Sequence, residues 1–165
     1  MVSWDDPNII SSSEKFLKLK QGENKIRIVS EAGVFGKHWV NKKTTICIGK
    51  EDGCMGCEAG NESKPAWLCW VISRSDGKIK QMEIGYMIVK KINALAQTDE
   101  YKFSEIPPFD LTIIKSGEGL DTEYDVVASR KDTPLTDTEK AEIEGLTPIA
   151  EIIEKKKKIA SDEPF

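Results

Sequence analysis

The sequence predicts a mainly β domain, a small barrel interrupted by one cysteine-rich loop and followed by a short helical tail. Three observations predict this fold: several short runs alternate apolar and polar residues, one stretch among them has helical spacing, and the cysteine-rich stretch has no apolar periodicity. The 165 residues suit one ordinary domain with a tail. With 39% apolar and 32% charged residues, the chain can bury a core beneath a highly charged surface. This composition excludes a wholly disordered or a fibrous protein.

The first strands are expected before the cysteine-rich loop. Residues 16–20 and 25–29 both alternate, and the turn signal at 21–24 between them predicts a hairpin. A third strand is expected at Val34–Val40. Residues 1–13 are polar, and we expect them to form a flexible N-terminal segment.

The strands that complete the barrel follow the loop. The run 67–73 is the strongest strand signal of the chain, and a Ser-Asp-Gly turn returns it as 78–84. Residues 86–96 then switch to helical spacing, and two last strands fit 109–115 and 123–128. Many short strands with a single helix between them predict a five-stranded OB-fold barrel.

Three of the four cysteines lie within eleven positions of one another. Cys54 and Cys57 form a Cys-x-x-Cys knuckle, and Cys47 and the only histidine, His38, precede it. Three cysteines with one histidine are a common structural ligand set for Zn²⁺, so we predict a structural zinc ion on these four residues. Three alternatives stay open: Cys69 as the fourth ligand, a redox dithiol at the knuckle, and loop thiols that bind no metal. Because Cys69 falls within the strand at 67–73, we expect it in the core.

Basic and aromatic residues are interleaved on both sides of the cysteine-rich loop. This mixture holds single-stranded nucleic acid in many proteins, since cations track the phosphates and exposed rings stack on bases. The alternative is that the tryptophans belong to the barrel core and the lysines to a solvated face. The predicted nucleic-acid contacts are Lys37, Trp39, Lys42, Lys43, Trp70, Arg74, Lys78, Lys80, Tyr86, Lys90 and Lys91.

Residues 132–165 are expected to form a helical and acidic tail. Thr136 and Glu139 make a capping-box pattern, and a second, short helix is expected to begin at 147–148. The chain closes on an acidic pair followed by Pro-Phe, a group that can fill a basic and apolar pocket on a partner. The predicted partner-binding residues are Asp162, Glu163, Pro164 and Phe165.

Charge and motifs restrict the function. The formal net charge of −4 divides into −2, +6 and −8 over residues 1–10, 11–91 and 92–165. A basic central part of the sequence therefore precedes an acidic C-terminal part. An acidic average is therefore a poor argument against a polyanionic partner. Phosphate-loop and nucleophile-elbow motifs are absent and the lone histidine is assigned to the metal, so we expect no enzymatic activity. We also expect a cytoplasmic protein, because the chain has no apolar run of ~18 residues and its start lacks a signal-peptide pattern.

Two parts of the chain resemble known single-stranded DNA-binding proteins. The tip at 162–165 resembles the acidic Pro-Phe tip through which bacterial single-stranded DNA-binding proteins recruit replication and repair partners. Residues 16–128 resemble the gene-32-type proteins of tailed phages. That second resemblance rests on Gly22–Ile28, on His38, Cys47, Cys54 and Cys57 in the same order, on Lys78–Lys80 and on Ile84–Ala94. It implies an OB-fold with an inserted zinc subdomain, and single-stranded DNA in a basic, aromatic cleft between the two.

The predicted protein is therefore a phage-encoded one that coats and protects single-stranded DNA during replication, recombination or repair in the bacterial host. Its OB domain would span 14–131 with a zinc loop at about 38–66, between the segment 1–13 and the tail 132–165. Two other functions remain open. One is a zinc-ribbon adaptor that binds proteins and no nucleic acid, and the other is a thiol-redox protein.

Overall fold

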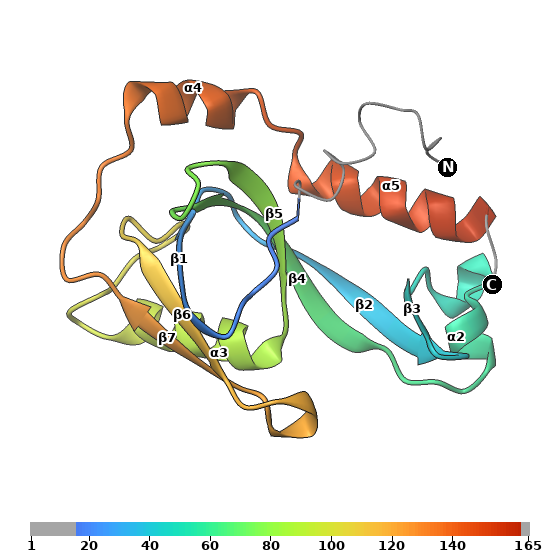
Figure 1. The fold of residues 1–165 in the computed structure, drawn as a ribbon. Coiled ribbons are helices and arrows are strands. Elements are labelled where there is room, and N and C mark those ends of the chain that lie inside the picture. Colours follow the sequence, from blue (N-terminus) through green and yellow to red (C-terminus); the bar gives the residue numbers. More distant parts are fainter. Residues whose placement is uncertain (1–15, 163–165) are drawn as a thin grey trace, which may run out of the picture.

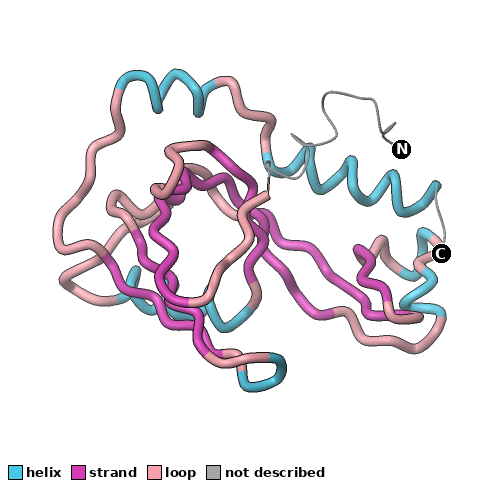
Figure 2. The backbone as a smooth tube through the Cα atoms, viewed as in Figure 1, coloured by secondary structure: helices cyan, strands magenta, loops and turns pink. Residues whose placement is uncertain are grey.

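The computed structural model describes residues 16–162, which form one seven-stranded antiparallel sheet and four α-helices (Figures 1 and 2). The strands are β1 (Gly22–Ile28), β2 (Gly33–Val40), β3 (Lys43–Ile46), β4 (Lys64–Ser73), β5 (Ile79–Ile84), β6 (Leu111–Ser116) and β7 (Glu123–Ala128). The helices are α2 (Met55–Glu58), α3 (Tyr86–Gln97), α4 (Asp137–Glu144) and α5 (Ile149–Asp162), and short 3₁₀ turns occupy Lys50–Asp52 and Gly119–Asp121.

The strand order is β3-β2-β4-β1-β6-β7, and β5 pairs with the other edge of β4. Strand β4 is the longest: its end pairs with β1 (Ile26 opposite Ser73), and its beginning pairs with β2 (Gly33 opposite Leu68). The fold is therefore mainly β and OB-like, as predicted from the sequence. The barrel is not closed, because β5 and β7 do not pair with each other in the described part of the chain.

The barrel core is built by alternate residues of the strands. Cys69, Val71, Met82, Leu111 and Ile113 are each no more than 1% exposed and belong to one apolar cluster. Helix α3 covers one opening of the barrel with the apolar stripe that its helical spacing predicts. Ile88, in this stripe, is buried. The alternation of apolar and polar residues along five strands is therefore enough to predict which side chains form the main core.

Strand β2 extends beyond the barrel and carries a separate arm (Figure 2). We define the arm as residues 37–63: the end of β2, strand β3, the 3₁₀ turn and α2. Asn41 and Lys42 connect β2 to β3 and both have positive φ, at 52° and 62°, as a two-residue type I′ hairpin turn requires. Between residues 41 and 63 only Cys54 and Gly56 are buried, so the arm has almost no apolar core.

The tail folds back onto the barrel and the arm. Thr136 and Glu139 form the predicted capping box at the start of α4. Helix α5 packs Ile149 and Ile153 against Phe35 and Leu68 in a second apolar cluster, and runs beside β2 and β3 (Figure 1). This helix continues to Asp162 and is 14 residues long, so it is not the short helix expected from the sequence.

Two local expectations were wrong. Residues 16–20 do not form a hairpin with 25–29: only Phe16 bridges to a strand, in parallel with Gln81 of β5, and Leu17 and Leu19 pack on the barrel core. The cysteine-rich stretch is not free of regular structure, because β3 pairs with β2, and Cys54 is the N-cap residue of α2. Both differences come from tertiary contacts that local patterns do not contain. No helix in residues 16–162 is long and apolar enough to cross a membrane.

Candidate metal centre and nucleic-acid interface

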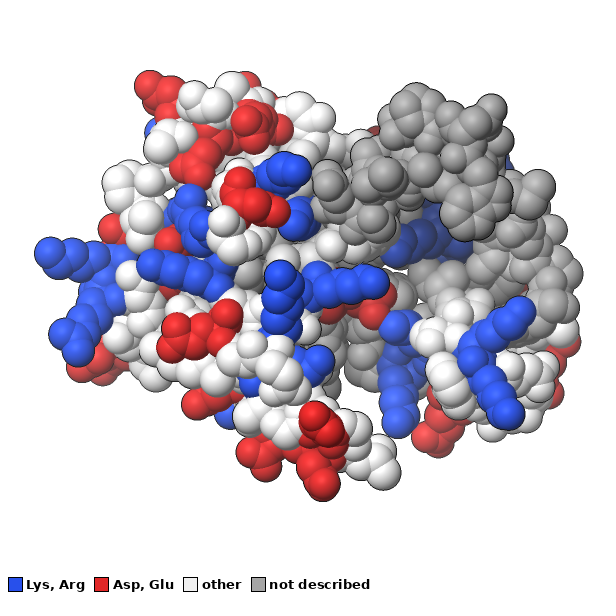
Figure 3. Space-filling view, viewed as in Figure 1, with Lys and Arg blue, Asp and Glu red and all other residues white. Residues whose placement is uncertain are grey.

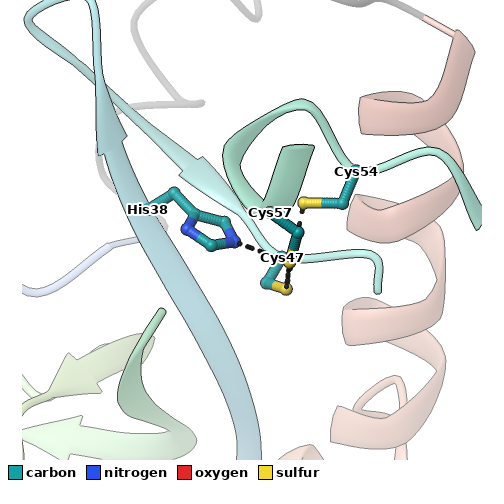
Figure 4. A group of neighbouring side chains, drawn as sticks. All are labelled: His38, Cys47, Cys54 and Cys57. Atoms are coloured by element: carbon teal, nitrogen blue, oxygen red, sulfur yellow. Dashed lines mark hydrogen bonds between the residues drawn. The ribbon is translucent and has the colours of Figure 1, made fainter. Parts of the chain in front are cut away.

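Four side chains of the arm converge on one point: His38 from β2, Cys47 after β3, and Cys54 and Cys57 at the two ends of the first turn of α2 (Figure 4). Their ligand atoms all lie within 4.8 Å of one another. The Cys57 Sγ atom is 3.5 Å from the Cys47 Sγ and 3.5 Å from the His38 Nε2, and the Cys54 and Cys47 Sγ atoms are 3.9 Å apart. Ligands of a tetrahedral Zn²⁺ are separated by about 3.5–3.8 Å, given metal bonds of about 2.0–2.3 Å. The four residues therefore fit one tetrahedral metal ion.

The histidine is held in the orientation that a metal ligand needs. His38 is 1% exposed, and its Nδ1 lies 3.0 Å from the Oδ1 of Asn61. A hydrogen bond from Nδ1–H to that oxygen leaves the lone pair of Nε2 directed toward the cysteines. Asn61 also donates from Nδ2 to the backbone carbonyl of Trp39, at 2.9 Å. The same side chain thus fixes both the histidine ring and the strand that carries Trp39.

Gly56, within the knuckle, allows the ring to approach. A Cβ atom at this position would lie 2.4 Å from the His38 Cγ, which is closer than carbon atoms pack. Glycine is therefore required here for the space it leaves, since helical φ and ψ values suit any residue. From the sequence, Gly56 was expected to permit a tight backbone in the knuckle, whereas the structure shows that it leaves space for the His38 ring. Asn61 was given no role. Spacing alone contains no signal for residues that support a site through space.

The thiols of the cluster differ strongly in acidity. Burial alone would raise the pKa of Cys54, but hydrogen bonds from the backbone N–H groups of Cys57 and Ile48, and from neighbouring thiols, lower it to about 6. The hydrogen bond with Cys47, together with burial, raises the pKa of Cys57 to about 11. Three closely spaced sulfur atoms cannot all become thiolates without a compensating cation, and a divalent metal supplies that charge.

Cys69 lies elsewhere, in the barrel core. It is 1% exposed, and burial raises its pKa to about 12. The structure thus places His38, and not Cys69, with the three arm cysteines.

A groove of about 480 Å³ separates the arm from the barrel. Lys37, His38 and Trp39 of β2 form one wall, and Glu83–Gly85 at the end of β5 form part of the other. Trp39 is 63% exposed, and Tyr86, which follows Gly85 directly, is 62% exposed. Two predicted aromatic contacts are therefore available to solvent, Trp39 in the groove and Tyr86 one residue beyond its lining.

The predicted lysines differ in their contacts. Lys37, Lys80 and Lys91 form ion pairs with Glu83, Asp76 and Asp125, at 2.5, 2.7 and 3.3 Å. Lys78 is exposed on the turn before β5. The lysines that are exposed and form no ion pair with any residue in 16–162 are Lys42, Lys43 and Lys90. Lys42 and Lys43 lie at the tip of the β2–β3 hairpin, beside Trp39.

Trp70 and Arg74 are bound to the tail. The Trp70 ring packs on the second cluster, and its Nε1–H donates to the carbonyl of Thr147 at 2.9 Å. Arg74 pairs with Asp110 at 3.0 Å and with Glu139 at 2.8 Å, and these carboxylates outweigh burial and raise its pKa. Both residues hold the tail on the barrel. Any role in binding nucleic acid stays a prediction for them.

The predicted tip lies almost entirely outside the described residues. Asp162 is the last residue of α5, and Glu163, Pro164 and Phe165 are not described.

The sequence is similar to that of one curated phage protein. The chain is 31% identical to a protein of Escherichia phage T5 named "Probable ssDNA-binding protein", over 157 aligned positions that cover 75% of this chain. The aligned part spans only 59% of the phage protein's own length. No protein-family profile matches the chain. No solved structure matches it either.

Proposed function

We propose that this protein binds single-stranded DNA in the groove between the arm and the barrel. The observation that carries the proposal is the exposure of Trp39 in that groove and of Tyr86 directly after its Gly85 edge, with Lys42 and Lys43 at the adjacent hairpin tip. OB-folds bind oligonucleotides on the face of their second and third strands and on the neighbouring loops, and the arm is an insertion in the first of those loops. The name of the phage T5 relative supports the same ligand.

In this proposal the aromatic side chains and the lysines have separate roles. Trp39 and Tyr86 stack on bases, which every base permits because each has a flat π face. Lys42, Lys43 and Lys90 neutralise phosphates, and Lys78 contributes a further positive charge. Lys37, Lys80 and Lys91 contribute where their present carboxylate contacts yield to the DNA. Such contacts carry little sequence information, so binding should be largely independent of sequence.

The metal in this proposal is zinc, with a structural role. His38, Cys47, Cys54 and Cys57 would hold it, and four protein ligands leave no open position for a substrate. Bound zinc supplies folding free energy to the arm and thereby positions Trp39. The protein would act by binding alone, without catalysis.

The finer biological role extends the same proposal. The protein would coat and protect single-stranded DNA of a phage during replication, recombination or repair in the host cytoplasm, in the manner of gene-32-type proteins. Residues 14–131 would form the DNA-binding domain with the zinc loop at about 38–66, and the tip at 162–165 would bind replication or recombination proteins.

The decisive experiment is a fluorescence-anisotropy titration of labelled oligo-dT at ~50 and ~200 mM salt, with a duplex of equal length as competitor. We expect preference for the single strand and a steep loss of affinity with salt. Trp39→Ala should weaken binding about 5- to 150-fold, the equivalent of about 1–3 kcal/mol for one stacked base. Trp39→Phe, which keeps a ring, should restore most of that affinity.

Absence of oligo-dT binding at the lower salt by the unaltered, zinc-loaded protein would overturn the proposal. The zinc-ribbon adaptor would then be the better hypothesis. A knuckle that titrates as a free dithiol in the purified protein would instead favour the thiol-redox function.

A further inference from the structure

A second groove, of about 500 Å³, lies on the barrel away from the arm. One side is the stretch from Phe16 to Ile26, and the other is the turn between β4 and β5, from Ser73 to Lys80. Five basic residues line it against two acidic ones: Lys18, Lys20, Lys25, Arg74 and Lys80 against Glu23 and Asp76. The groove therefore has an excess of positive charge.

Three of these lysines have no competing partner. Arg74 and Lys80 are paired with carboxylates, but Lys18, Lys20 and Lys25 are exposed and form no ion pair with any residue in the described range 16–162. Figure 3 shows Lys and Arg side chains across the middle of this face with some Asp and Glu among them, and further Asp and Glu over α4 and over the β6–β7 loop.

The backbone under these lysines is fixed. The Asn24 side chain accepts from the Lys20 N–H at 2.9 Å and donates to the Lys20 carbonyl at 2.8 Å. The Lys25 carbonyl accepts from the Arg74 N–H at 3.0 Å, and the Leu17 N–H donates to the Gln81 carbonyl at 2.8 Å. None of these bonds uses a lysine ammonium group. The chain therefore presents the three charges from a rigid frame without neutralising them.

An aromatic ring completes the groove. Phe16 lines it and is 42% exposed, and the Lys156 Nζ lies 5.3 Å from the ring centroid. A partly exposed ring beside unpaired cations is the combination that holds single strands: a stacking surface next to phosphate contacts.

Strand β5 connects the two grooves. Lys80, near its start, lines this groove, and Glu83–Gly85, at its end, line the groove beside the arm. Five residues of extended chain span about 17 Å. OB-folds engage about 4–16 nucleotides, so one strand can occupy both grooves.

We propose that Lys18, Lys20, Lys25 and Phe16 form a second binding groove for the same single DNA strand, occupied only when the strand is too long for the groove beside the arm. This inference rests on the proposed function. The lysines bind successive phosphates and Phe16 stacks on a base. The ligand is recognised as a flexible polyanion with flat bases, which a duplex does not present in this form.

The test compares K18Q/K20Q/K25Q with the control K102Q/K131Q/K140Q, in which three exposed lysines outside both grooves are changed and the net charge is altered equally. Both proteins are titrated with oligo-dT of about 5 and about 15 nucleotides. The groove variant should bind the longer oligonucleotide about 10- to 100-fold more weakly at ~0.1 M salt, and the slope of log K against log salt should fall by about two. Binding of the short oligonucleotide should match the control.

A second measurement uses the unaltered protein, so it does not depend on the variant folding. Lysine acetylation followed by mass spectrometry should show protection of Lys18, Lys20 and Lys25 by the long oligonucleotide and not by the short one. Equal affinity of the two triple variants for the long oligonucleotide, or no protection of these lysines, would overturn the inference while leaving the arm groove as the binding site. Failure of the unaltered protein to bind either oligonucleotide would instead overturn the proposed function itself.

Discussion

The barrel and the arm are parts of one sheet, yet different forces hold them. The barrel encloses apolar side chains from five strands and α3. The arm extends the same strand β2, but it buries only Cys54 and Gly56 between residues 41 and 63 and gathers four metal-ligand atoms instead. Because burial of apolar area scales with the residues enclosed, the barrel can fold by the hydrophobic effect and the arm cannot. The exposed aromatic ring proposed to bind DNA thus lies on the region whose structure we expect to depend on a bound metal ion.

The strongest test of this comparison is removal of the metal. A structural zinc ion contributes on the order of 10 kcal/mol of binding free energy to a small site, and the arm has almost no apolar core to replace it. Chelation should therefore abolish hydrogen-exchange protection in β3 and α2 and leave β1 and β4–β7 protected. Cys47→Ser should reproduce this local loss, measured by the same exchange experiment.

Cys69→Ala is the matched control, since it removes a cysteine from the barrel core and none from the metal cluster. It should keep one bound metal ion per chain. An arm that stays protected after chelation would contradict the comparison and would assign its stability to α5, whose residues Ala160 and Ser161 line a pocket with Cys54.

The converse test weakens the barrel. Leu111 is fully buried and lies opposite Ile26 in the β1–β6 pairing. Leu111→Ala should lower the free energy of unfolding by about 2–5 kcal/mol, because a large side chain leaves a cavity that the core fills only in part. Urea denaturation measures this change, and metal content should remain one ion per chain.

Leu120 provides the comparison for this variant, because the same residue type is fully exposed there, in the β6–β7 loop. Leu120→Ala should change the free energy of unfolding by less than about 0.5 kcal/mol. Loss of metal from the folded Leu111→Ala protein would show that the arm is not independent of the barrel core.

The same difference explains what could be predicted from the sequence. Barrel strands alternate because one face is buried, so 67–73, 78–84 and 123–128 were found close to their observed bounds. The arm has no buried face, and β3 was therefore missed. The proximity of its four candidate metal ligands could still be predicted, because ligand chemistry restricts residue type and spacing.

Contacts between distant segments could be predicted neither from strand alternation nor from ligand spacing. The alternation of Phe16–Lys20 is that of a strand, but Leu17 and Leu19 pack on the barrel core without a hairpin partner. Likewise, nothing in the sequence near Trp70 indicates that Thr147 accepts its indole N–H. Such pairings depend on how the tail folds back, which local patterns do not determine.

The smallest expected effect concerns the tail, which polar contacts fasten to the barrel. Glu139 accepts from the Thr136 backbone N–H and pairs with Arg74, and these contacts lower its pKa below the ordinary value of 4.5. A lowered pKa means that the ionised form stabilises the fold at pH values above 4.5 and that this contribution is lost as the pH falls through the folded-state value. Glu139→Gln keeps the capping-box geometry and removes the charge, so it should cost about 1 kcal/mol at pH ~7 and less at pH ~3. Thermal denaturation at both pH values measures this, with Glu142→Gln on the exposed side of α4 as the control. An equal loss in the control, or a loss that is undiminished at low pH, would show that the charge of the helix, and not the contact with Arg74, holds the tail in place.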